Sequence, residues 1–155
     1  MSNPTFPLHP SQFEIYVDQL INPESPCYNI GLYIKLNGPL NKEIFHQAVN
    51  SSPTVFDAFK MRFDFNDTDP VCYFDKNYKH LDLTEIDCSN KNNPKKEAKS
   101  WMQNQFNIPF KIQKENFLFE NVLIKISSDE HWFFFRYHHL ITAFVLLLLW
   151  GDFFS

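Results

Sequence analysis

Two adjacent histidines, His138 and His139, close an aromatic segment that spans residues 132–137. Imidazole is the side chain best suited to proton transfer near neutral pH, so the pair is a candidate acid–base site. Adjacent residues of a strand point to opposite faces of a sheet, so only one of the two rings could face a given substrate. A histidine pair held in a core or on a surface for structural reasons alone is the alternative interpretation.

A metal site is not expected around this pair, because it would need further ligands at suitable spacing. His131 alternates out of step with His139 on a strand, and no HExxH or CxxC spacing occurs. Residues 64–70 are similar to the start of a calcium loop, but Asp69 stands where an EF-hand needs glycine. We therefore expect no metal ligands and a simple hairpin turn at that loop.

Composition limits the class of protein. The 155 residues fit one domain with a real core, in which 18 phenylalanines and only 3 glycines must pack without many close backbone approaches. A net charge of -4 and the lack of a basic, aromatic-interleaved stripe give nucleic-acid binding little support.

Three scattered cysteines and a start without a signal peptide predict reduced thiols in a cytoplasmic protein. The apolar run 140–150 is about half of the ~20 residues that a spanning helix needs, so we expect no membrane span.

The elements that must position the histidines are predicted from periodicity. A capping box at Ser11 and Glu14 predicts a first helix that ends at Asn22, and Asn41 predicts the cap of a second helix that Pro53 interrupts. A third helix is expected around residues 98–106. Strands are expected at residues 30–36, 59–65, 71–74, 81–86, 117–126 and 132–138, with a hairpin turn at 127–130. Mixed elements with antiparallel final pairs indicate an α+β fold.

Residues 135–142, Phe-Arg-Tyr-His-His-Leu-Ile-Thr, resemble the HHxxxDG active-site motif of nonribosomal peptide synthetase condensation domains. Residues 8–16 are similar to the first helix motif of that family, S-x-A-Q-x-R-x-W, and residues 57–63 to its strand motif, H-E-x-L-R-T-x-F. Residues 22–30 and 106–110 resemble the segments before its first strand and before its histidine hairpin. The order of these stretches extends the resemblance over positions 7–142.

The resemblance implies the N-terminal lobe of a chloramphenicol acetyltransferase-like fold, with helices packed on a mixed, largely antiparallel sheet. The family transfers an acyl group from a thioester on one carrier-protein phosphopantetheine arm to an amine held on another carrier protein. His139 takes the implied catalytic role, and His138 the first, more structural position. The implied partners are peptidyl or acyl carrier proteins or adjacent synthetase modules, with a separately encoded second lobe as a further option. No directly bound cofactor is implied.

The chain departs from the family pattern directly after the histidines. The motif's aspartate falls at Ala143 and its glycine at Phe144. In the family this aspartate pairs with an arginine of the strand motif, whose position is Lys60 here, with Arg62 two residues on and on the same face of the expected strand. A buried cation without its carboxylate could cost roughly 3–5 kcal/mol.

We therefore expect residues 1–142 to form an incomplete condensation domain, followed by an aberrant apolar tail, 143–155, that reads like out-of-frame sequence. Condensation domains place their site between two such lobes. A fragment that is inactive by itself is the first functional hypothesis, and whether the chain is an enzyme stays open. A carrier-protein-binding or lobe-completing interaction module is the alternative, and a peptide anchored to a membrane through residues 145–150 is a third.

Overall fold

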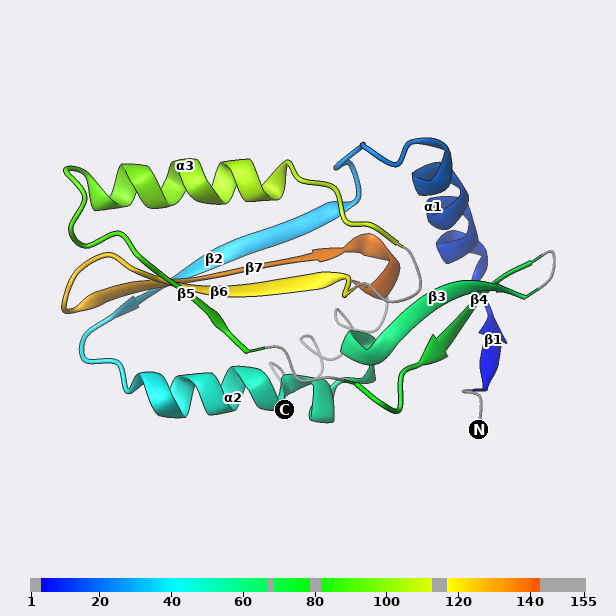
Figure 1. The fold of residues 1–155 in the computed structure, drawn as a ribbon, viewed down its shortest axis with the longest axis horizontal. Helices are drawn as coiled ribbons and strands as arrows, with labels where there is room; N and C mark the ends of the chain where they lie inside the picture. The colour runs from blue at the N-terminus through cyan, green and yellow to red at the C-terminus, as the bar shows by residue number, and fades with distance from the viewer. Residues whose placement is uncertain (1–3, 67–68, 79–81, 113–116, 143–155) are drawn as a thin grey trace, which may run out of the picture.

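The computed structural model describes residues 4–66, 69–78, 82–112 and 117–142. Three α-helices and two sheets make up the described chain (Figure 1). The helices are α1 (Pro10–Ile21), α2 (Lys42–Val55) and α3 (Pro94–Phe106). The larger sheet has the order β2 (Asn29–Asn37), β7 (Glu130–His138), β6 (Phe119–Lys125) and β5 (Thr84–Asp87). Its pairs are antiparallel except β5 with β6, which confirms the predicted α+β class and the mixed, largely antiparallel sheet.

Two helices cover opposite faces of the larger sheet (Figure 1). On one face, Ala98 and Met102 of α3 share a buried cluster with Trp132 of β7. On the other face, the ring of Phe45 in α2 meets Phe133 of β7 edge to face, with ring centroids 5.2 Å apart. Because successive strand residues point to opposite faces, a strand between two helices needs apolar residues at every position. This explains the aromatic run before the histidines.

A smaller antiparallel sheet lies beside α1 at the other end of the molecule (Figure 1). Its strands, in order, are β1 (Thr5–Pro7), β4 (Asp69–Phe74) and β3 (Met61–Asn66). Asn66 is opposite Asp69 in the β3–β4 register, so the predicted hairpin there is confirmed, although the turn residues 67–68 lie outside the described residues. Met61, Phe63 and Cys72 of this sheet belong to the same buried cluster as Tyr16 of α1.

The predicted start of the first helix was wrong by two residues. The helix begins at Pro10 after an N-cap at His9, whose backbone N–H donates to Gln12 Oε1 at 3.2 Å, and Ser11 lies inside the helix. Proline suits the first helical position because its fixed φ is already helical and no N–H is needed there. When the glutamine of the family motif S-x-A-Q-x-R-x-W is aligned with Gln12, the serine of the motif falls on His9, the observed N-cap.

The second helix begins as predicted and ends later than predicted. Asn41 Oδ1 accepts the backbone N–H of Ile44 at 3.1 Å, which confirms the cap. Pro53 does not end the helix, which continues to Val55. Proline leaves the carbonyl four residues earlier without its helical donor. The hydroxyl of Ser52 donates to that Val49 carbonyl at 2.7 Å, which accounts for the continuation.

No helix among the described residues is long and apolar enough to cross a membrane. Cys27 is exposed, Cys72 and Cys88 are buried, and none of the three is in a disulfide. The predicted apolar tail, residues 143–155, lies outside the described residues.

Candidate active site

His138 ends β7 in a fully buried position, with an exposed fraction of 0%. Its Nδ1 accepts the backbone N–H of Leu140 at 3.2 Å, and its Nε2 lies 3.1 Å from Gln19 Oε1. A nitrogen that accepts a hydrogen bond cannot carry the proton, so the proton of the neutral ring sits on Nε2 and is donated to Gln19.

Burial, with a smaller contribution from the neighbouring His139, lowers the pKa of His138 to about 4. Desolvation disfavours the charged form of an imidazole. His138 is therefore neutral near pH 7, with both ring nitrogens in hydrogen bonds to the protein. Such a ring is poorly placed to exchange protons with a substrate.

His139 is exposed and begins the 3-10 turn η2 (His139–Ile141). Its backbone N–H donates to the carbonyl of Tyr28 at 2.9 Å. Both histidines were predicted to be strand residues that point to opposite faces, and this prediction was wrong for His139 because β7 ends at His138. The direction of the His139 ring is set by the turn instead of the strand pleat.

The residues that follow His139 anchor this turn. Leu140 is 0% exposed, Ile141 2% and Thr142 1%, and the Thr142 hydroxyl donates to the His139 carbonyl at 2.6 Å. Within η2, His139 is thus the one side chain that meets solvent. A buried frame with a single outward imidazole is suited to present that ring to an incoming group.

Two glutamines of α1 hold the turn from one side. Gln12 Nε2 donates to the Leu140 carbonyl at 2.9 Å. Gln19 Nε2 donates to the carbonyls of Asn22 and Ser25 at 2.9 and 3.2 Å, which orients its Oε1 toward His138. The two glutamines are seven residues apart, two helical turns, and so lie on one helix face. Sequence reasoning missed both, and their two-turn spacing is the signal that could have found them.

Lys60 and Arg62 do not share a strand face, so that prediction was wrong. Residues up to Lys60 form the 3-10 helix η1 (Asp57–Lys60), and only Arg62 lies in β3. The ammonium group of Lys60 pairs with Asp57 Oδ1 at 2.8 Å, three residues away in the same turn.

Arg62 is a buried cation, with an exposed fraction of 3%. Its Nη1 donates to the carbonyls of Phe59 and Met61 at 3.1 and 2.9 Å, and its Nη2 lies 4.0 Å from Asp75 Oδ2. Burial lowers the pKa of Arg62, and the Asp75 carboxylate opposes this shift. Arg62 thus has partners within the described residues, and the predicted cost of an unpaired cation does not apply to it. Ala143 lies outside the described residues.

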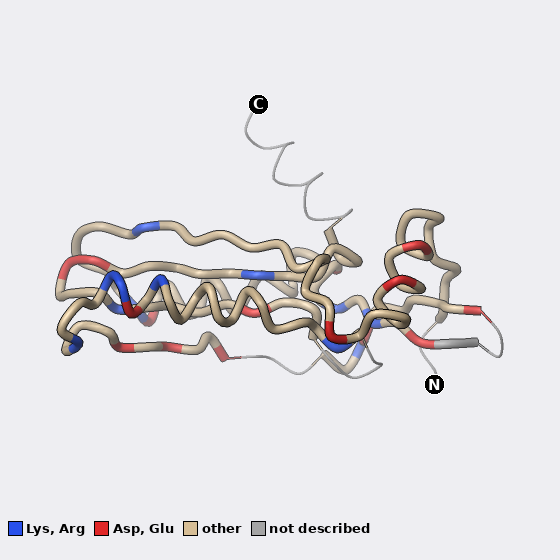
Figure 2. Tube along the Cα trace, turned by 90° about the horizontal axis from the view of Figure 1, so that it is seen from above, with Lys and Arg blue, Asp and Glu red and all other residues tan. Residues whose placement is uncertain are grey.

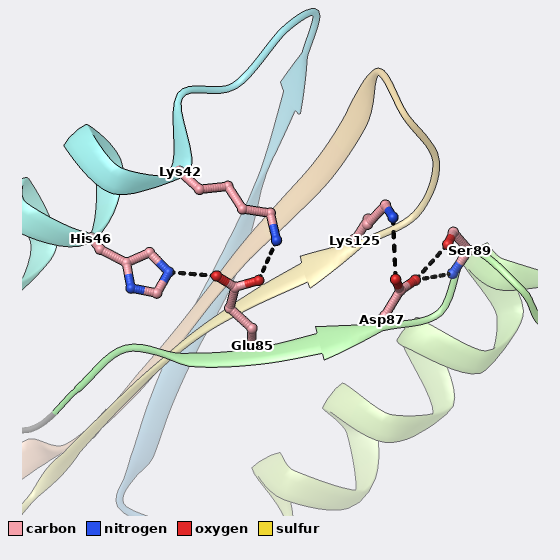
Figure 3. Close-up of polar contacts among 6 residues, drawn as sticks. All are labelled: Lys42, His46, Glu85, Asp87, Ser89 and Lys125. Atoms are coloured by element: carbon pink, nitrogen blue, oxygen red, sulfur yellow. Dashed lines mark hydrogen bonds and ion pairs between the residues drawn. The ribbon is translucent and has the colours of Figure 1, made fainter.

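A second polar cluster lies at the other end of the larger sheet (Figure 3). Glu85 of β5 pairs with Lys42 and, at 2.7 Å, with Nε2 of His46, both from α2. The hydrogen bond from Lys42 is the main cause that lowers the pKa of Glu85. Across the described residues, no group of three or more His, Cys, Asp or Glu side chains is arranged to hold a metal ion.

Charge is dispersed over the molecule. In the described part of the chain, Lys and Arg positions are interspersed with Asp and Glu positions, and they form no continuous basic stripe (Figure 2).

Comparison with known proteins identifies the family. The family model described as "Condensation domain" matches residues 2–145. A plipastatin synthase of Bacillus subtilis (strain 168) is 29% identical over 98% of this chain and 6% of its own length. The Dimodular nonribosomal peptide synthase of the same strain is 28% identical over 84% of this chain and 5% of its own length.

Solved structures show the same fold. The starter condensation domain of rhizomide synthetase RzmA matches with a TM-score of 0.82 at 24% identity, over 88% of this chain and 34% of that chain. The first condensation domain of the CDA synthetase matches with a TM-score of 0.79 at 21% identity, over 89% of this chain and 36% of that chain. The chain therefore spans about a third of the solved chains that it matches.

Proposed function

Because this chain belongs to the condensation-domain family of nonribosomal peptide synthetases, we propose that it is the histidine-bearing lobe of such a domain and that His139 is its catalytic residue. The observation that carries the proposal is the frame around the pair: His138 is buried and hydrogen-bonded, while His139 faces solvent from a buried turn. In this proposal residues 1–142 are the lobe, and residues 143–155 are a separate segment.

In the proposed reaction, the amine of one carrier-bound substrate attacks the thioester carbonyl of the other. The new C–N bond forms as the C–S bond breaks, and the thiol of the phosphopantetheine arm leaves. His139 takes up or holds the amine proton, or stabilises the charge of the tetrahedral intermediate. His138 stays neutral and supports the turn. The phosphopantetheine arms arrive as parts of the substrates, so the lobe itself binds no cofactor.

The lobe by itself is proposed to be catalytically silent. Catalytic groups act when they are held within about 0.5 Å of the productive geometry in a site that excludes water. His139 is exposed to solvent in the described chain, which covers only 34% of a solved condensation domain. A second lobe would supply the opposite wall of the site.

An amide-formation assay tests this directly. The purified chain is mixed with two carrier proteins, one loaded with an acyl thioester and one with an aminoacyl thioester, and the products are followed by mass spectrometry. We expect no amide above the level without protein. Amide formation that disappears in His139→Ala would contradict the proposed silence and support the catalytic role, whereas product that persists in His139→Ala would contradict that role.

An interaction module is the second candidate function, and the edge of the larger sheet favours it. Leu32 and Ile34 of the edge strand β2 are 48% and 47% exposed. A long edge strand with exposed apolar side chains is a ready surface for a protein partner. The proposed partner is a carrier protein, an adjacent synthetase module or a separate second lobe.

Binding experiments separate this candidate from the first. The purified chain is titrated with a carrier protein and, separately, with the part of the RzmA starter condensation domain that this chain does not cover. We expect Leu32→Lys to weaken binding at least about tenfold, with the exposed Lys99→Ala on α3 as control. No binding to either partner would count against the module. The proposed carrier-dependent chemistry also implies a cytoplasmic chain, which cell fractionation would test.

A further inference from the structure

Tyr28 contacts both members of the histidine pair. Its backbone carbonyl accepts the N–H of His139 at 2.9 Å, and its ring lies against the His138 ring with centroids 5.8 Å apart. Asn29 is opposite His138 in the β2–β7 register, so the hydrogen bond to Tyr28 adds one further rung beyond the end of β7. This rung holds the first residue of η2, the turn that presents His139.

The rung lies where the two strands separate. Tyr28 is the last residue of the connection between α1 and β2, residues 22–28, and the backbone of His139 turns away into η2. The end of a ladder opens more readily than its centre, because fewer neighbouring contacts hold it. The position of the Tyr28 carbonyl therefore depends on how the tyrosine side chain is anchored.

The side chain of Tyr28 is anchored to α1. Its hydroxyl donates to Asp18 Oδ2 at 2.9 Å, and Asp18 Oδ1 accepts the side-chain amide of Asn22 at 3.1 Å. The hydrogen bond to Asp18 is the main cause that raises the pKa of Tyr28 above its ordinary value, so the phenol keeps the proton that it donates near pH 7. A hydrogen bond to a carboxylate is about twice as strong as one between neutral groups.

We propose that Tyr28 is a positioning residue for His139: through its hydrogen bond to Asp18, it fixes the carbonyl that holds the first residue of η2. The proposal rests on the proposed catalytic role of His139, and Tyr28 acts through that residue without contacting substrate. The two glutamines of α1 hold the residues directly before and after His139, whereas Tyr28 holds His139 itself.

Amide hydrogen exchange in the full chain tests this, because it reports how often the His139 N–H leaves the Tyr28 carbonyl. Tyr28→Phe keeps the ring against His138 and removes only the hydroxyl. We expect the His139 amide to exchange at least about fivefold faster in this variant. The amide of Phe134, in the middle of β7, should keep its rate, and the free energy of unfolding in urea should stay nearly the same.

The matched control is Tyr33→Phe. It removes the same hydroxyl from a tyrosine of β2 whose ring packs on Trp132 instead of on the histidine pair. This variant should leave the His139 exchange rate unchanged.

Variants of Asp18 test whether the hydroxyl acts through the carboxylate. Asp18→Ala should raise the His139 exchange rate by a factor similar to that of Tyr28→Phe, and Asp18→Asn should keep most of the protection because it retains an oxygen acceptor. In the Asp18→Ala background, Tyr28→Phe should have no further effect, because the interaction is already absent.

An unchanged His139 rate in Tyr28→Phe would overturn the proposal. An equally large increase in the Asp18→Ala background would also overturn it, because the hydroxyl would then act without Asp18. An increase shared by the Phe134 amide and matched by a loss of unfolding free energy would make Tyr28 a general structural residue, against the proposal. None of these measurements uses acyl transfer, so a failure of the catalytic role shows separately, as amide product that persists in His139→Ala.

Discussion

Replacing Gln19 by leucine should lower the free energy of unfolding by about 2 kcal/mol. Gln19 is 2% exposed and lies between α1 and the end of β7. Leucine has a similar size, so the change removes hydrogen bonds without opening a large cavity. The loss is therefore a measure of what the glutamine contributes to the frame of the histidine pair.

The magnitude follows from the groups left without partners. His138 Nε2–H donates to Gln19 Oε1 and is fully buried. An unsatisfied buried donor costs about 1–3 kcal/mol. Gln19 also donates to the carbonyls of Asn22 and Ser25. These residues are not buried, so water can replace the glutamine there at little cost. The buried imidazole N–H accounts for most of the expected loss.

Urea unfolding followed by circular dichroism measures the change, with Gln103→Leu as the matched control. Gln103 is exposed on α3, and a surface change of this kind stays within about 0.5 kcal/mol. In nuclear magnetic resonance spectra, the slowly exchanging Nε2 proton of His138 should be present in the unmodified chain and lost in Gln19→Leu. A Gln19→Leu variant as stable as the Gln103→Leu control would refute the assignment of Gln19 as the partner of His138.

Three further outcomes are expected. The pKa of His138 is about 4, below its ordinary 6.5, so between these values the unfolded chain binds a proton that the folded chain excludes. The free energy of unfolding should therefore fall by roughly 3 kcal/mol from pH 7 to pH 4. His138→Gln should remove most of this pH dependence, and an unchanged dependence in that variant would contradict the assignment to His138. Ser52→Ala should lower the free energy of unfolding in urea by about 1 kcal/mol, because the Val49 carbonyl loses its hydrogen-bond donor. The exposed Ser51→Ala should lower it by less than about 0.5 kcal/mol. Equal losses would contradict the role of Ser52 in continuing α2 past Pro53. His139→Ala should leave the unfolding free energy within about 0.5 kcal/mol, because the side chain is exposed; a larger loss would assign His139 a structural role.

The strongly periodic elements were predictable because their patterns are local. Residues 30–36 and 132–138 fall within β2 and β7, and the turn at 127–130 joins the predicted antiparallel pair. The partner of β2 was not predictable, because β7 lies about 100 residues further along the chain. The parallel pairing of β5 with β6 likewise depends on how the intervening α3 packs on the sheet, and no local sequence pattern indicates that packing.

The site was predictable in its histidines but not in its support. The pair His138 and His139 is visible as a motif, whereas Gln12 and Gln19 look like ordinary polar positions of an amphipathic helix. Their role depends on contacts with residues 119 and 128 positions away. Lys60 was misplaced for a related reason: alternation of apolar residues from Phe59 onward looks like strand, but the 3-10 turn before β3 occupies its first two positions.

The turn that presents His139 is held by α1, near the start of the chain, through Gln12 and Gln19. The orientation of His139 therefore depends on a folded lobe, in which both ends of the described chain are packed together. The His139 side chain is exposed, by contrast, and only a further protein surface could cover it. A folded lobe is thus sufficient to place the imidazole and insufficient to shield it from water, which is why placement and activity should separate in the assays proposed above.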